Sequence, residues 1–190
     1  MGTVRLLLVA VAFLGAAVPL HAFTDDALWA SLRQGGQVVL VRHALTTPGV
    51  GDPEGMKLSD CSTQRNLSNE GREHAKRVGD AFRARQVPVA QLISSPWCRC
   101  IETATLAFGR KPETSPALGN LFGRGELQAA QVAQLKTLAG RKPQSGNTIM
   151  VSHGSTIWAL TNVMPVMGEM VVLTPKADGG FVVAGRLVVP

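Results

Sequence analysis

The sequence predicts a single α/β domain, a three-layer α/β/α sandwich around a mostly parallel sheet. Short apolar runs rich in β-branched residues, such as 37–42 and 147–151, alternate with segments of helical periodicity. Two of these runs are followed by a histidine, His43 and His153. Because parallel sheets bind ligands at the carboxyl ends of their strands, we expect both imidazoles at one ligand site.

The expected elements follow one another without a repeat or a linker. We expect helices at 24–34, from 68 onward, and at 96–108, 126–138 and 155–163, and strands at 37–42, 89–94, 115–118, 147–151, 170–173 and 181–189. Thr24 and Ser68 are suitable N-caps for the first two helices. The last two strands are expected to pair as a hairpin around 178–180. The polar stretch 45–67 is a long loop, and such loops are usually functional or mobile.

The first 22 residues have the pattern of a secretory signal peptide. Arg5 supplies a positive charge, 6–14 is apolar and uncharged, and 20–22 can serve as a cleavage site. The apolar stretch is barely long enough for the alternative, an uncleaved anchor. Cleavage leaves residues 23–190, enough for one domain with a normal core. We therefore expect an exported protein with no stable membrane insertion after cleavage.

The charge of the chain suits an anionic partner. The formal net charge is +6, and no block of lysine and arginine is present. The chain has no tyrosine that could stack on bases. A basic balance of this kind fits an anionic substrate or an anionic envelope surface, and we expect no nucleic-acid partner.

Two arginines accompany the two histidines. Arg42 precedes His43, and Arg99 lies in the first turn of a predicted helix, where backbone N–H groups and the positive helix end face the same way. His153 lies at a second strand-to-helix turn. Two imidazoles and two guanidinium groups at one place would form an anion site, best suited to phosphate.

These residues fall in three ordered motifs that resemble the histidine phosphatase superfamily, with its phosphoglycerate-mutase-like fold. The motifs are Arg-His-Ala at 42–44, where the family usually has Arg-His-Gly, Ser-Ser-Pro-x-x-Arg-x-x-x-Thr-Ala at 94–104, and Ser-His-Gly at 152–154. The resemblance covers about 37–173. The run Cys-Ser-Thr-Gln-Arg-Asn-Leu-Ser at 61–68 and the Trp-Cys-Arg segment are similar to the exported lipopolysaccharide core heptose phosphate phosphatases.

The resemblance implies a metal-independent phosphatase without a cofactor. The neutral imidazole of His43 would attack phosphorus and form a phosphohistidine. Arg42, Arg99 and His153 would stabilise the charge on the transferring group. Arg65 would be a further phosphate ligand or a rim arginine. The implied substrate is a small phosphorylated compound such as an envelope glycolipid sugar phosphate, and the implied location is the periplasm.

The general acid is where the chain departs from the family. A sugar or alkyl leaving group needs a proton donor. The family usually supplies a glutamate in a Leu-x-Glu setting, and Asn120 stands at that position. Glu126 is the best substitute, although it could simply stabilise a helix N-terminus. Acidic residues of the long loop are rivals: Asp52, Glu54 and Asp60. Asn120 and Ala44 also motivate an alternative function, a catalytically idle phosphate- or sugar-phosphate-binding protein.

Three cysteines leave the disulfide pairing open. A Cys61–Cys98 bridge would tie the long loop to the phosphate-binding helix and hold Arg65 and Arg99 in place. Cys61–Cys100 is the competing pairing. A zinc site made of these cysteines and a histidine is less well supported, because neither His-x-His nor Cys-x-x-Cys spacing is present.

Overall fold

The structure is a computed structural model that describes residues 25–190. The signal peptide expected at 1–22 and the N-cap expected at Thr24 lie outside these residues. Among the residues described, no helix is both long and apolar enough to cross a bilayer. The helices are α1 (Asp25–Gln34), α2 (Asn69–Ala84), α3 (Cys98–Phe108), α4 (Gln128–Gly140) and α5 (Gly154–Thr161). The strands are β1 (Val38–Arg42), β2 (Val89–Ser94), β3 (Glu113–Thr114), β4 (Asn147–Ser152), β5 (Met170–Pro175) and β6 (Phe181–Leu187).

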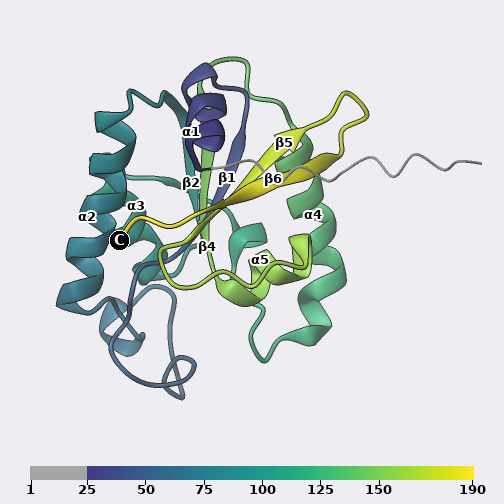
Figure 1. Cartoon of the computed structure of the whole chain (residues 1–190). Helices are drawn as coiled ribbons and strands as arrows, with labels where there is room; N and C mark the ends of the chain where they lie inside the picture. Colours follow the sequence, from purple (N-terminus) through teal and green to yellow (C-terminus); the bar gives the residue numbers. More distant parts are fainter. Residues whose placement is uncertain (1–24) are drawn as a thin grey trace, which may run out of the picture.

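The six strands form one mixed sheet, which confirms the predicted sandwich. Their order is β3-β2-β4-β1-β5-β6. β1 and β2 both pair parallel with β4, and β3 pairs parallel with β2. β5 pairs antiparallel with β1, and β6 with β5, so the hairpin expected at the end of the chain is confirmed. In Figure 1 helices lie on both sides of this sheet, with α2 and α3 opposite α4 and α5.

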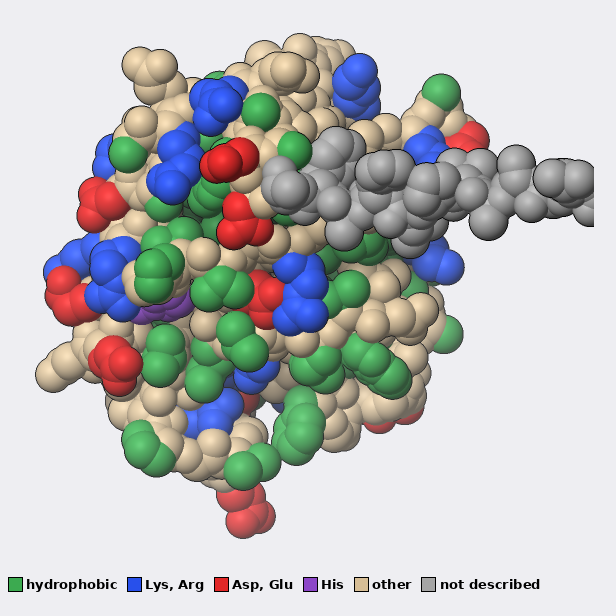
Figure 2. Space-filling model, in the orientation of Figure 1, with side chains coloured by type: hydrophobic (Ala, Val, Ile, Leu, Met, Phe, Trp, Pro, Cys, Tyr) green, Lys and Arg blue, Asp and Glu red, His purple; other side chains and the backbone are tan. Residues whose placement is uncertain are grey.

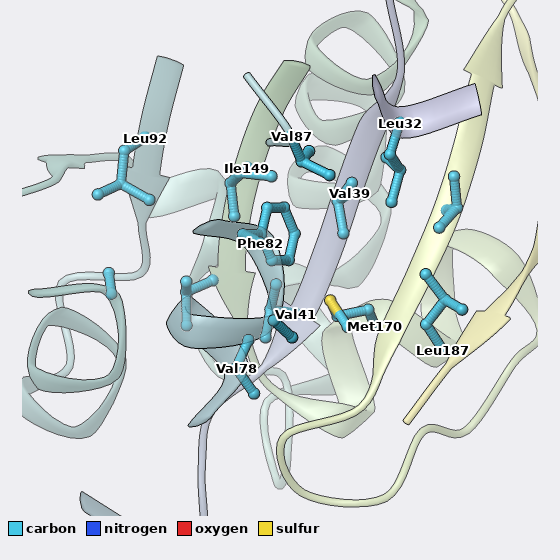
Figure 3. Close-up of a cluster of buried hydrophobic side chains, with 14 of the residues drawn as sticks. Leu32, Val39, Val41, Val78, Phe82, Val87, Leu92, Ile149, Met170 and Leu187 are labelled. Atoms are coloured by element: carbon cyan, nitrogen blue, oxygen red, sulfur yellow. The ribbon is translucent and has the colours of Figure 1, made fainter. Parts of the chain in front are cut away.

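Two hydrophobic clusters join the layers. On one face Phe82 of α2, Leu32 of α1 and Leu187 of β6 belong to a cluster with alternate residues of β1, such as Val39 (Figure 3). On the other face α4 and α5 pack on Leu40 and its neighbours. β4 is buried along its whole length. A strand covered on both faces reads as a continuous apolar run, which is why the sequence identified it.

The helix beginning at Ser68 is confirmed in detail. Ser68 has an extended backbone, and its side chain accepts a hydrogen bond from the backbone N–H of Gly71 at 3.0 Å. This bond satisfies one of the free N–H groups of the first turn. The cap therefore fixes where the long loop ends and α2 begins.

The prediction of a strand at 115–118 is wrong. The strand that pairs with β2 is Glu113–Thr114, and a 3₁₀ helix at Pro116–Leu118 follows it. Pro116 lacks the N–H that a ladder requires, and its fixed φ suits the first position of a helix. The helix expected from 126 begins at Gln128, after a 3₁₀ turn at Gly125–Leu127.

Candidate active site

Strand register brings the two motif histidines together at one edge of the sheet. Arg42 of β1 pairs with Ser152 at the end of the parallel strand β4. The next residues, His43 and His153, therefore leave the sheet side by side, with ring centroids 5.4 Å apart. The backbone N–H of His43 donates to the Ser152 carbonyl oxygen at 2.9 Å, which continues the strand pairing into the site.

His43 is buried and held in one tautomer. Its Nδ1 lies 2.8 Å from the carbonyl oxygen of Ala44. A carbonyl oxygen only accepts, so Nδ1 carries the hydrogen and Nε2 keeps its lone pair. Burial lowers the pKa of His43 to about 3; the bond to Ala44 opposes this shift, and the neighbouring guanidinium groups add to it. At neutral pH the imidazole is therefore uncharged and nucleophilic at Nε2.

Arg99 lies in the first turn of α3 and is only 1% exposed. The carboxylate of Asp52 accepts from its Nη1 at 2.6 Å and from its Nη2 at 3.2 Å. Asp52 also accepts from Nε1 of Trp97 at 3.0 Å. Burial raises the pKa of Asp52, but the hydrogen bonds and charge of Arg99 outweigh this and lower it overall. Asp52 is thus an ionised loop residue that orients Arg99.

His153 is buried at the N-cap of α5, with a partner on each ring nitrogen. Nη2 of Arg99 lies 3.3 Å from Nδ1 of His153. A guanidinium has no acceptor, so Nδ1 accepts, and Nε2 donates to the Ser95 hydroxyl at 2.8 Å. Burial lowers the pKa of His153 well below its ordinary value, and His43 and the arginines add to the effect. The ring is therefore neutral.

Arg42 and Arg65 complete the group of cations. Arg42 Nη1 donates to the Pro165 carbonyl oxygen at 2.8 Å, and the guanidinium of Arg65 donates to the Gly49 carbonyl oxygen. The pKa of each arginine is lowered, first by burial and then by the neighbouring positive charges. The Nε atoms of Arg42, Arg65 and Arg99 are buried without a hydrogen-bond partner in residues 25–190. Since buried N–H groups normally have partners, these three are available to an anion.

A cavity of about 350 Å³ opens over these groups. Five of its lining residues are the histidines and arginines: Arg42, His43, Arg65, Arg99 and His153. Gly154 keeps it open, because a methyl group there would lie 3.1 Å from the guanidinium carbon of Arg42. Figure 2 shows a hollow in the lower half of this face, with blue Lys or Arg and green hydrophobic side chains on its border.

Asn120 lines the cavity where the family places an acid. Its Oδ1 accepts from the backbone N–H of Phe122 at 3.1 Å and from the Ser155 hydroxyl at 3.0 Å. Only the Nδ2 amide is then left for a substrate, and an amide donates a hydrogen bond but not a proton.

The carboxylates proposed as acids lie elsewhere. Glu126 is exposed in the Gly125–Leu127 turn and does not line the cavity, and the same holds for Glu54 and Asp60. Asp52 is ionised and bound to Arg99. Within residues 25–190, no carboxylate lines the cavity.

The disulfide pairs Cys61 with Cys98, so this expectation is confirmed over Cys61–Cys100. It links the 3₁₀ helix Cys61–Thr63 of the long loop to the first turn of α3. Cys100 is a buried free thiol 3.5 Å from Nε2 of His153, and burial raises its pKa to about 12. In the part of the chain that the structure describes, no three His, Cys, Asp or Glu side chains are grouped to hold a metal ion.

Sequence reasoning missed several supporting groups. It considered Asp52 only as an acid, and gave no role to Ser95 or to the Pro165 carbonyl that positions Arg42. Asp52 and Pro165 are far from their partners in sequence, so no local pattern marks them. Thr103 links two of the motifs: its hydroxyl accepts from the backbone N–H of Ala44 at 3.1 Å and donates to the carbonyl oxygen of Arg99 at 2.7 Å.

A neutral histidine that lines the cavity beside three guanidinium groups has the chemistry needed to accept a phosphoryl group. Residues 38–126 match the histidine phosphatase superfamily (branch 1). The matched segment contains β1, the long loop, α2, β2 and α3. Over these residues, a little under half of the chain, the sequence is similar to this superfamily.

Solved structures share the fold. A phosphoserine phosphatase from Entamoeba histolytica has a TM-score of 0.60 and 13% identity, covering 80% of this chain and 97% of its own. A phosphoglycerate mutase from Thermus thermophilus has a TM-score of 0.53 and 20% identity, covering 81% and 99%. The protein histidine phosphatase SixA complexed with tungstate has a TM-score of 0.55 and 17% identity, covering 80% and 96%. No curated protein sequence matches the chain significantly.

Proposed function

We propose that the protein is a metal-independent phosphomonoesterase that forms a phosphohistidine at His43. The observation that carries this proposal is the hydrogen bond from Nδ1 to the Ala44 carbonyl, which leaves the Nε2 lone pair for attack. Nε2 would bond to phosphorus while the bond to the leaving-group oxygen breaks. Water would then hydrolyse the phosphorus–nitrogen bond and release inorganic phosphate.

In this proposal Arg42 and Arg99 stabilise the charge on the phosphoryl oxygens through their unpartnered N–H groups. Arg65 is a further ligand, because its Nε is unpartnered and it lines the same cavity. His153 aligns Arg99, because its Nδ1 accepts from Nη2 of that arginine. Nδ1 would have to gain a hydrogen before it could donate to a phosphoryl oxygen. The guanidinium groups of Arg42, Arg65 and Arg99 are held in place before substrate arrives, so little reorganisation of them is needed.

We further propose that the substrate is a small phosphorylated compound of the periplasm, with an envelope sugar phosphate as the expectation from the sequence. The signal-peptide pattern at 1–22 supports export, and the Cys61–Cys98 disulfide is compatible with an exported protein. For a sugar leaving group Glu126 is our proposed acid. It would have to reach the cavity from the exposed turn in which it lies.

The test is to trap the covalent intermediate. The mature protein is mixed with p-nitrophenyl phosphate, quenched without acid and measured by intact mass. Wild type should gain one phosphoryl group and release p-nitrophenol, and His43→Ala should do neither. His74→Gln is the matched control, because His74 is a buried histidine outside the cavity, and it should still form the adduct.

Two results would contradict the proposal. Turnover by His43→Ala would exclude His43 as the nucleophile. Phosphate binding by wild type, without adduct or turnover, would favour the alternative function of a phosphate- or sugar-phosphate-binding protein.

A further inference from the structure

Three exposed apolar side chains surround the mouth of the cationic cavity. Val50 is 86% exposed, Phe122 59% and Met164 53%, and all three line the cavity. They come from three separate segments: the long loop, the segment before α4 and the segment after α5. Single exposed apolar residues are common, but their convergence on one cavity marks a surface that binds something apolar.

Unless Glu126 moves in from its exposed turn, the same cavity offers no proton to a leaving group. No lining residue within 25–190 has a carboxylate, and Asn120 in the acid position cannot donate a proton. The nearby Asp52 has both oxygens bound to Arg99 and a lowered pKa. Cleavage is therefore favoured for substrates whose leaving group departs without protonation.

The cavity also has a net positive charge, because three guanidinium groups face it and, within residues 25–190, only the carboxylate of Asp52 is there to balance them. Arg42, Arg65 and Arg99 face it, and Asp52 is bound to Arg99. The Nε atoms of Arg42 and Arg65 remain unpartnered among the described residues. A ligand with two adjacent phosphate groups fits this excess better than one with a single phosphate.

We propose that the site takes amphiphilic diphosphates, in which a phosphoanhydride is attached to an apolar body. This proposal rests on the proposed function. Nε2 of His43 bonds to the terminal phosphorus, and the bond from that phosphorus to the bridging oxygen breaks. The electron pair leaves with the remaining alkyl monophosphate, a weak base that needs no proton donor. Water then cleaves the phosphohistidine, giving inorganic phosphate and returning a proton to solvent. The apolar body packs against Phe122, Met164 and Val50.

The test compares four probes on the mature wild-type protein: hexyl diphosphate, hexyl monophosphate, pyrophosphate and p-nitrophenyl phosphate. Hexyl monophosphate keeps the apolar body without the anhydride, and pyrophosphate keeps the anhydride without the body. Hexyl diphosphate should exceed pyrophosphate in kcat/KM by about tenfold or more, since a few methylene groups in an apolar site give discrimination of this size. It should exceed hexyl monophosphate by at least as much, since only the anhydride has a leaving group that departs without protonation.

The rim is tested by the double variant Phe122→Ser, Met164→Ser. The ratio of kcat/KM for hexyl diphosphate over pyrophosphate should fall at least about fivefold, since packing of the alkyl chain is lost. Val182→Ser is the matched control, because Val182 is a similarly exposed apolar residue on β6, away from the cavity. Its ratio should equal that of wild type.

The outcomes separate the two proposals. Absence of both adduct and turnover with p-nitrophenyl phosphate would overturn the proposed function itself. If the protein turns over p-nitrophenyl phosphate but hexyl diphosphate is no better a substrate than pyrophosphate or hexyl monophosphate, only the preference for amphiphilic diphosphates would be overturned. An unchanged ratio in the rim variant would also overturn it.

Discussion

Acidification should destabilise the folded protein through His43 and His153, the two buried histidines of the cavity. Burial lowers the pKa of His43 to about 3 and that of His153 well below its ordinary value. In the unfolded chain a histidine has a pKa of about 6.5. Below that pH the unfolded state takes up protons that the folded state excludes, so this contribution to stability is complete above the unfolded pKa and is lost as the pH falls. Between pH 7 and pH 5 this effect should lower the free energy of unfolding by about 2 kcal/mol for His43, and His153 should add a loss of the same sign.

The assay is urea unfolding in phosphate-free buffers at pH 7 and pH 5, followed by tryptophan fluorescence. Wild type should lose more than about 2 kcal/mol over this range, because His153 adds to the loss from His43. His43→Gln removes one titrating group and should lose about 2 kcal/mol less than wild type, whatever its stability at pH 7. The reasoning would be refuted if His43→Gln and wild type lost the same amount, since the pH dependence would then arise elsewhere.

Three further outcomes are expected. Arg42→Ala should lower kcat for p-nitrophenyl phosphate by about 10²–10³-fold, because one preorganised donor to the phosphoryl oxygens is lost; an unchanged kcat would exclude that role. Gly154→Ala should lower kcat/KM by about tenfold through its methyl group 3.1 Å from the Arg42 guanidinium, whereas Gly125→Ala, whose methyl group would meet nothing within 4 Å, should match wild type. Replacing Cys61 and Cys98 by alanine should lower the free energy of unfolding by about 3–4 kcal/mol for a bridge spanning 37 residues, measured by urea unfolding; a clearly smaller loss would mean that the unfolded chain retains structure without the bridge.

The sequence predicts the parts of the fold that are buried on both faces. β1 and β4 are continuous apolar runs, and each is followed by a motif histidine. Parallel pairing of these runs was enough to place His43 and His153 at one site. Arg42, the last residue of β1, pairs with Ser152, the last residue of β4, so the two strands end at the same edge of the sheet.

Short edge elements were not predictable in the same way. β3 has only two residues, both exposed, and so carries no apolar pattern. The 3₁₀ helix after it forms because Pro116 cannot join the ladder. Glu126 was expected to begin a helix, but it lies in a separate turn that leaves it exposed. Local propensity therefore misjudged the segment that determines which acid can reach the cavity.

The groups that orient the phosphate site are also beyond sequence reasoning, because their partners lie far apart in the chain. Asp52 and Arg99 are 47 residues apart, and Arg42 and Pro165 are 123 apart. The first of these contacts depends on the path of a long loop, which a hydrophobic pattern does not specify.

The position of Asp52 has a consequence for how Arg99 can bind an anion. Asp52 occupies Nη1 and Nη2 on the outer edge of the guanidinium, and Nε has no partner among the described residues. Nη2 of Arg99 makes two contacts: one with Oδ2 of Asp52 at 3.2 Å and a slightly longer one with Nδ1 of His153 at 3.3 Å. Two phosphoryl oxygens could accept hydrogen bonds from Nε and from the second hydrogen of Nη2. This bidentate contact would leave both bonds to Asp52 intact and break only the bond to Nδ1 of His153. Asp52 therefore balances one charge and holds Arg99 without blocking the edge on which a phosphoryl group would bind.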